Sequence, residues 1–175
     1  MSEKIARLGK LEIDLEELSE FLVEAKKKGY AGRGRKTIER DGSKTFPFHD
    51  GNFYYTDNYE GSLQAQGCEL IRWKKEDEQR IWSMTRFGGM LPKYRGNGFS
   101  KEVYPFLKES LLKIDSEHPF RGPHEYKSKE FGLKYISSFV GDITGFHGEE
   151  KIISNRINLI VFSQKFMGGL FIPKD

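Results

Sequence analysis

The stretch Phe53-Tyr54-Tyr55-Thr56-Asp57-Asn58-Tyr59-Glu60-Gly61 returns in outline as Leu133-Lys134-Tyr135-Ile136-Ser137-Ser138-Phe139-Val140-Gly141, at an offset of 80 residues. Both copies are rich in the aromatic and β-branched residues that favour strands, and both end at a glycine. With the same offset and no gap, residues 53–91 align with residues 133–171. The identical pairs are Tyr55/Tyr135, Gly61/Gly141, Glu69/Glu149, Ser83/Ser163, Gly88/Gly168 and Gly89/Gly169.

A helix is expected before each copy. Asp14 is a predicted N-cap, and Glu17 three residues later completes a capping box. An apolar stripe at helical spacing follows, made of Leu15, Leu18, Phe21, Leu22 and Ala25, and it ends at Gly29. The second helix is expected over roughly residues 103–114. Its start is placed after Ser100, because Pro105 lacks the N–H that an interior helical position donates.

These patterns predict an α+β protein, built as a tandem αβββ repeat with antiparallel sheet(s) and two main helices. Residues 1–175 are treated as a single domain with two pseudo-equivalent halves, roughly 14–91 and 100–171. A pseudo-two-fold axis would then pass between the halves, and a cleft on that axis is a natural ligand site. Whether the half-sheets join edge to edge or face to face is left open.

Composition excludes several classes of protein. With 29 Lys+Arg against 26 Asp+Glu, the net charge of +3 is too small to indicate nucleic-acid binding. No apolar run approaches the roughly 18 residues that span a bilayer. The N-terminus shows no secretion signal, and the single cysteine, Cys68, cannot form an internal disulfide. A cytoplasmic location is therefore expected, with no membrane partner; oligomeric state stays open.

Several segments carry a resemblance to a known family: residues 53–61, Gly67-Cys68-Glu69, Trp82-Ser83-Met84, Gly88-Gly89 and Pro119-Phe120-Arg121-Gly122-Pro123. Over about residues 15–171 the chain resembles a prokaryotic family of uncharacterised small domains. The resemblance implies that members occur alone or behind a helix-turn-helix regulator, and it implies no activity. A helix-turn-helix is not expected before residue 14, so a regulatory role would lack a DNA reader of its own.

Three groups of side chains are candidates for a site. Tyr55, Tyr59, Trp82 and Tyr135, with Phe139 and Phe162, could line an aromatic pocket, or they could be ordinary strand core. Arg121 lies between two prolines and suits a carboxylate or phosphate, unless it pairs with an internal acid. Glu69 and Glu149 could converge as a pair of carboxylates, or each could cap a turn or lie on a solvated strand face. Gly148 follows Gly141 by one residue more than Gly67 follows Gly61, so whether Glu149 or Glu150 corresponds to Glu69 is left open.

Three functions follow from these candidates. The first is binding or sensing of a small molecule in an aromatic cleft between the halves. The second is an enzyme that uses Glu69 or Glu149 as general acid/base on a small anionic substrate oriented by Arg121. The third is a nucleic-acid or protein interaction module that uses the basic loop of residues 26–36, with Arg33 and Arg35.

The sequence favours binding over catalysis. Ser83 is not on a Gly-x-Ser-x-Gly elbow, and no nucleophile–base pair is evident. The four histidines, His49, His118, His124 and His147, form no helical i, i+4 pair and have no cysteine partners, so no metal site is expected. No cofactor motif is found either.

Overall fold

A computed structural model describes residues 4–32, 34–75, 78–96 and 98–174. It is an α+β structure with two α-helices, a short 3-10 helix and a large antiparallel sheet. The helices are α1 (Leu15–Lys28), η1 (Pro92–Tyr94) and α2 (Ser100–Leu111). The strands are β1 (Ile5–Leu8), β2 (Leu11–Asp14), β3 (Thr37–Ile38), β4 (Lys44–Asp50), β5 (Phe53–Gly61), β6 (Gln64–Trp73), β7 (Arg80–Met90), β8 (Glu125–Ser128), β9 (Leu133–Asp142), β10 (Gly145–Ser154) and β11 (Leu159–Leu170).

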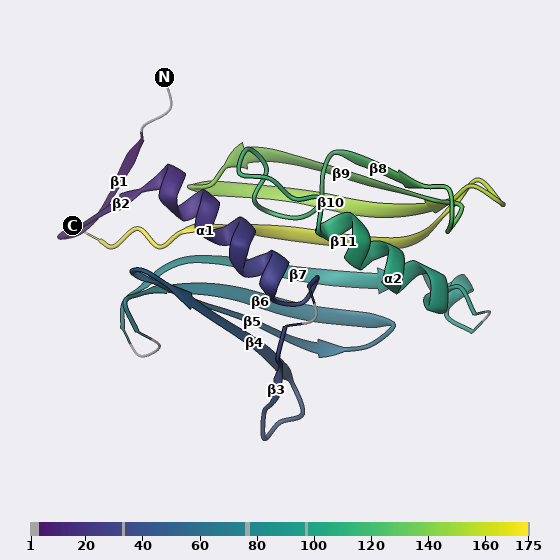
Figure 1. Ribbon diagram of the computed structural model, residues 1–175, viewed down its shortest axis with the longest axis horizontal. Helices are drawn as coiled ribbons and strands as arrows, with labels where there is room; N and C mark the ends of the chain where they lie inside the picture. Colours follow the sequence, from purple (N-terminus) through teal and green to yellow (C-terminus); the bar gives the residue numbers. More distant parts are fainter. Residues whose placement is uncertain (1–3, 33, 76–77, 97, 175) are drawn as a thin grey trace.

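The main sheet has nine strands in the order β3-β4-β5-β6-β7-β11-β10-β9-β8, while β1 and β2 form a separate hairpin. Strands β5, β6 and β7 are therefore joined to β9, β10 and β11 edge to edge, through pairing of β7 with β11. Arg86 on β7 lies opposite Phe166 on β11 at the middle of that pairing. Figure 1 shows these two strands running through the centre of the sheet.

Both α-helices lie on the same face of the sheet (Figure 1). The Asp14 carboxylate caps α1 as predicted, accepting hydrogen bonds from the N–H groups of Glu16 and Glu17 at 2.8 and 3.1 Å. The predicted stripe of α1 packs on β5, β6 and β7, and its buried members are Leu18, Phe21, Leu22 and Ala25. The buried face of α2 packs on the other half of the sheet, through Val103, Phe106, Leu107 and Leu111.

The second helix begins earlier than the sequence predicted. It starts at Ser100, with Pro105 inside it, and ends at Leu111. Proline removes one ladder bond, the one to the carbonyl oxygen four residues before it. That residue is Lys101, which is exposed in the first turn, where water can replace the missing donor.

Alternation along the central strands sorts side chains between the two faces. On β7, Trp82, Met84 and Arg86 are buried beneath the helices, whereas Ser83 and Thr85 point the other way. No helix in the described part of the chain is long and apolar enough to cross a membrane. The helix-covered face of β5, β6, β7, β10 and β11 carries the site described next.

Candidate functional site

Six charged side chains are buried between the sheet and the helices. They are Lys26 from α1, Asp57 from β5, Glu69 from β6, Arg86 from β7, Arg121 from the segment before β8, and Glu150 from β10. None is more than 9% exposed. Charged groups are seldom buried this deeply unless they are paired, and here three cations meet three anions.

Glu69 is the centre of the network. Its carboxylate forms ion pairs with Lys26 and with Arg86, whose Nη1 lies 3.2 Å from Glu69 Oε1. Arg86 also donates from Nη2 to Asp57 Oδ1 at 2.6 Å, and Lys26 Nζ donates to the carbonyl oxygen of Phe120 at 2.7 Å. One carboxylate therefore joins α1 to two strands of the sheet.

Glu150 holds the other end of the network. Arg121 bonds to it through Nε at 3.1 Å and Nη2 at 2.8 Å, a two-point contact that fixes the plane of the guanidinium. Gln164 Nε2 donates to Glu150 at 2.8 Å, and the Tyr135 hydroxyl donates to it at 2.6 Å. Arg121 Nη1 lies 3.8 Å from Glu69 Oε1, so the two clusters meet at this guanidinium.

Burial and charge pull the pKa values of these groups in opposite directions. Burial alone would raise the pKa of Glu69, but Lys26, Arg86 and Arg121 together lower it below its ordinary value. For Asp57 burial prevails over Arg86, and the pKa is raised. Burial likewise lowers the pKa of Lys26 despite the attraction of Glu69. Glu69 is thus held as a carboxylate by its neighbours.

Glycines make room for the network. A Cβ at position 67 would lie 2.6 Å from Cζ of Arg86, so only glycine lets this side chain cross β6 to reach Asp57. Gly122 has the same role beside Tyr135, whose ring would lie 2.9 Å from a Cβ there. The Gly122 N–H donates to the Tyr135 hydroxyl at 3.0 Å.

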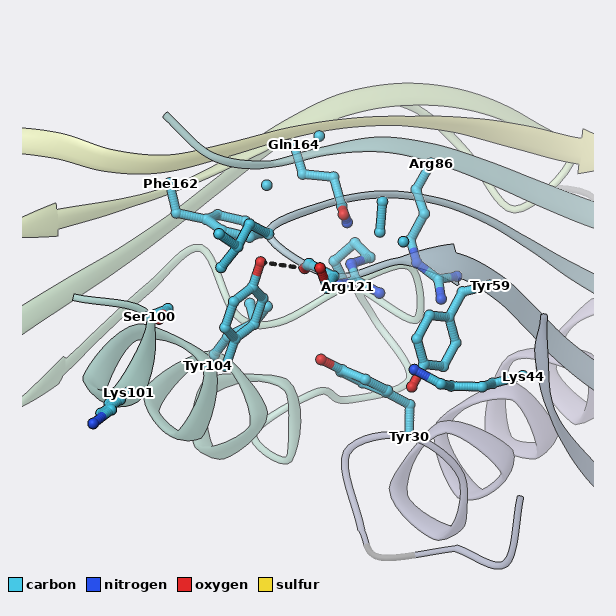
Figure 2. A pocket seen from close by; sticks show the side chains of 17 residues that line it. Tyr30, Lys44, Tyr59, Arg86, Ser100, Lys101, Tyr104, Arg121, Phe162 and Gln164 are labelled. Carbon is cyan, nitrogen blue, oxygen red and sulfur yellow. Dashed lines mark hydrogen bonds between the residues drawn. The ribbon is translucent and has the colours of Figure 1, made fainter. Parts of the chain in front are cut away.

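A cavity of about 380 Å³ opens above Arg86 and Arg121, between the two helices and the sheet. Figure 2 shows the rings of Tyr30, Tyr59 and Tyr104 around it. Tyr30 follows α1, Tyr59 lies on β5, and Tyr104 lies on α2 and donates to the Ser62 carbonyl oxygen at 2.6 Å. Phe162 and Gln164 on β11 also line the cavity, as do Gly88 and Gly89 on β7.

The lining of this cavity is positively charged. It includes Lys44, Arg86, Lys101 and Arg121, and among the described residues that line it none carries a carboxylate. Lys44 Nζ lies 5.4 Å from the ring centroid of Tyr59. Lys108 Nζ lies 4.8 Å from that of Tyr30. The Lys101 ammonium points away from the cavity in Figure 2.

The structure brings some of the sequence-predicted residues to this cavity and places others around it. Tyr59 and Arg121 line the cavity directly. Glu69 and Tyr55 do not line it; both are buried and lie with Lys26 around a smaller cavity. Tyr135 is buried behind Arg121 and orients Glu150.

Two other predicted residues lie elsewhere. Trp82 is fully buried, stacks on Phe146, and donates from Nε1 to the carbonyl oxygen of Ile143 at 3.0 Å. Glu149 lies on the face of the sheet away from the helices, where it pairs with Lys151 at 2.8 Å and accepts from Ser163. Two lysines of the basic loop already form ion pairs: Lys26 belongs to the network, and Lys28 pairs with Glu24. Arg33 lies outside the described residues.

The sequence analysis did not name Arg86, Tyr30 or Tyr104 as site residues, and it did not choose between Glu149 and Glu150. A signal for Arg86 is present in the sequence, because it follows Trp82 and Met84 at a spacing of two residues, which places the three side chains on one face of a strand. Tyr30 and Tyr104 lie far apart in sequence and meet only through the packing of the helices. Among the described residues, no three His, Cys, Asp or Glu side chains are grouped to hold a metal ion.

The fold and this network define a small α+β domain with a buried ionic core under a tyrosine-lined cavity. Residues 57–171 match the family described as a domain of unknown function (DUF5680), and the chain belongs to that family. The matched range includes every member of the buried network except Lys26. No curated protein and no solved structure matches the chain.

Proposed function

We propose that this protein binds a small anionic molecule with a planar aromatic part, in the cavity between its two halves. The observation that carries the proposal is the cavity lining, which combines two buried guanidinium groups with three tyrosine rings. Its volume of about 380 Å³ is within the usual range for small-molecule sites.

The charge of the lining favours an anion. The two guanidiniums are held from behind by Glu69 and Glu150, so their positions are set before a ligand arrives. Two lysines already lie near the rings of Tyr30 and Tyr59, which disfavours a second cation there. A carboxylate or phosphate would find two guanidiniums and three phenol groups there, and no carboxylate among the described residues of the lining.

The tyrosines favour a planar ligand. Tyr59 and Phe46 stack at 6.2 Å between centroids, and Tyr30 meets Tyr59 edge-on at 5.5 Å. Such fixed rings offer a large apolar contact at little entropic cost. Burial raises the pKa of Tyr30 to about 12, so its hydroxyl stays protonated and can donate a hydrogen bond to a ligand.

The two halves that flank the cavity are proposed to be copies of one αβββ unit. Three features support this. Gly88 on β7 faces Gln164 on β11, and Met84 faces Gly168. The offset of 80 residues converts each of these pairs into the other, as expected for two copies related by a two-fold axis. Gly61 is the last residue of β5 and Gly141 the last but one of β9, and their φ values are +102° and +99°. Each α-helix packs over its own half of the sheet.

An enzymatic role for Glu69 has weaker physical support. A general base works best when its pKa is near the working pH. The pKa of Glu69 is instead lowered, and its oxygens are occupied by Lys26 and Arg86. Binding fits the sensory domain of a prokaryotic regulator, the context that the sequence resemblance implies.

Thermal-shift and calorimetric titrations of the full chain test the proposal. Benzoate, salicylate and phenyl phosphate are compared with neutral benzamide and cationic benzylamine at one ionic strength. A ligand that binds only the folded state raises the free energy of unfolding by about 2.7 kcal/mol when its concentration is 100 times its Kd. For a chain of this size that raises Tm by roughly 5–11 °C. We expect that rise with at least one anion, and none with benzamide or benzylamine.

A charge-reversal pair locates the site. Lys44→Glu should abolish the shift, because residue 44 lines the cavity. Lys93→Glu is the matched control, since residue 93 lies outside the cavity beside Tyr94. Equal shifts with benzoate and benzamide, or equal losses in both variants, would show that the cavity does not select anions.

A further inference from the structure

Two histidines that are six residues apart in sequence meet at the surface beside β9. His118 and His124 flank the segment Pro119-Phe120-Arg121-Gly122-Pro123. Phe120 is buried in the core and Arg121 in the ionic network, so the middle of the segment is anchored inward. The two histidines remain outside, and their ring centroids lie 4.4 Å apart.

The rings face each other through the same nitrogen. The Nε2 atoms of His118 and His124 are 3.1 Å apart. Each Nδ1 faces an oxygen: that of His124 lies 3.2 Å from the Ser137 carbonyl oxygen, and that of His118 lies 3.4 Å from Asp115 Oδ1. Asp115 is itself fixed, because its Oδ1 accepts from the His118 backbone N–H at 3.0 Å.

These partners decide where the ring protons lie. A carbonyl or carboxylate oxygen only accepts, so each Nδ1 is assigned the proton of its neutral imidazole. Both Nε2 atoms then present lone pairs to each other across 3.1 Å. The contact between the two Nε2 atoms therefore needs a cation, either one further proton, which makes it a hydrogen bond, or a metal ion bound by both nitrogens.

We propose that His118 and His124 bind a borderline divalent transition metal ion, such as Zn²⁺ or Cu²⁺, through their Nε2 atoms. Two nitrogens at about 2.05 Å from a metal are about 2.9 Å apart at a right angle and about 3.4 Å apart at the tetrahedral angle. The separation of 3.1 Å lies between these limits.

The surroundings of the pair match those of metal-binding imidazoles. Such rings donate their other N–H to a carboxylate or a backbone carbonyl, as Asp115 and Ser137 allow here. The ring of Phe139 lies 5.5 and 5.6 Å from the two imidazoles and limits their rotation. His124 is exposed and His118 half-buried, so an ion can enter from solvent and keep water at its remaining positions.

The test uses the metal alone with the full chain. After treatment with EDTA and desalting, the protein is titrated with ZnCl₂ by calorimetry at neutral pH. We expect one equivalent of zinc to bind with micromolar affinity. His124→Asn and His118→Gln should each weaken binding at least about tenfold. His147→Asn is the matched control, because His147 is an exposed histidine on the neighbouring strand β10.

A second measurement uses no substitution. In a heteronuclear NMR spectrum of the unaltered protein, zinc should shift the ring signals of His118 and His124 and leave those of His49 and His147 in place. Absence of zinc uptake would overturn the proposal, and so would affinity that is unchanged in His124→Asn. Ring shifts confined to His49 or His147 would also refute it.

Discussion

Replacing Glu69 with glutamine isolates the energy of the buried ionic network. Glu69 is 1% exposed and contacts Lys26 and Arg86, with Arg121 at 3.8 Å. Glutamine keeps the shape and the hydrogen-bonding oxygen but removes one of the three negative charges. The network then carries an unbalanced positive charge in a site without bulk water. Breaking a buried ion pair from one side costs about 3–5 kcal/mol.

That loss is large against the usual stability of a domain, about 5–15 kcal/mol. For a chain of this length it lowers Tm by roughly 6–20 °C. Urea denaturation followed by circular dichroism measures the free energy of unfolding directly. Adding Lys26→Met to the Glu69→Gln chain should restore part of the lost free energy of unfolding. Asp57–Arg86 and Glu150–Arg121 then remain as two balanced pairs.

A double-mutant cycle measures the coupling energy between Lys26 and Glu69. We expect Lys26→Met/Glu69→Gln to be more stable than Glu69→Gln alone, with a coupling energy of about 1–3 kcal/mol. A loss below about 1 kcal/mol for Glu69→Gln, within the range of surface ion pairs, would refute the reasoning. Strict additivity of the two substitutions would refute it as well.

Three further predictions concern the same region. Because the folded-state pKa of Glu69 lies below its ordinary value, its stabilising contribution is full above pH 4.5 and is lost as the pH falls towards the folded-state pKa. Acid titration of unfolding should show this loss, by up to about 1.4 kcal/mol per pH unit, and Glu69→Gln should lack it. Gly67→Ala should destabilise by about 1–3 kcal/mol in urea, because its Cβ would lie 2.6 Å from Arg86, whereas Gly145→Ala meets no atom within 4 Å and should change stability by less than about 1 kcal/mol. Tyr135→Phe should cost about 1.5–3 kcal/mol in the same assay, since it removes a donor from buried Glu150; no measurable loss would show that Gln164 and Arg121 suffice.

Local patterns were sufficient for most of the secondary structure. The helix of residues 15–28 could be predicted with its cap, because Asp14 bonds to N–H groups within the next turn. The long strands could be predicted from their aromatic and alternating residues. The hairpin of β1 and β2 and the short strand β8 were missed, because four residues carry too little periodicity to be recognised.

The site depended on pairing that a sequence pattern cannot resolve. Glu149 and Glu150 are neighbours, and the spacing of the two alignable segments left open which one corresponds to Glu69. In the sheet, Glu69 lies opposite Asp57 and Glu150 lies opposite Ser137, so β6 and β10 correspond with an offset of 81 residues. Since side chains alternate between faces, a shift of one residue moves Glu149 to solvent and Glu150 to the network.

The sequence by itself determined the α+β class, the capped first helix and the face on which each central strand buries its apolar residues. These follow from interactions within a few residues or from the period of two along a strand. Only the tertiary structure decided that the half-sheets join edge to edge, that Arg121 meets Glu150, and that Tyr30 and Tyr104 share a cavity. Each of these contacts joins residues from different elements, and its partners are selected by the mutual packing of helices and sheet.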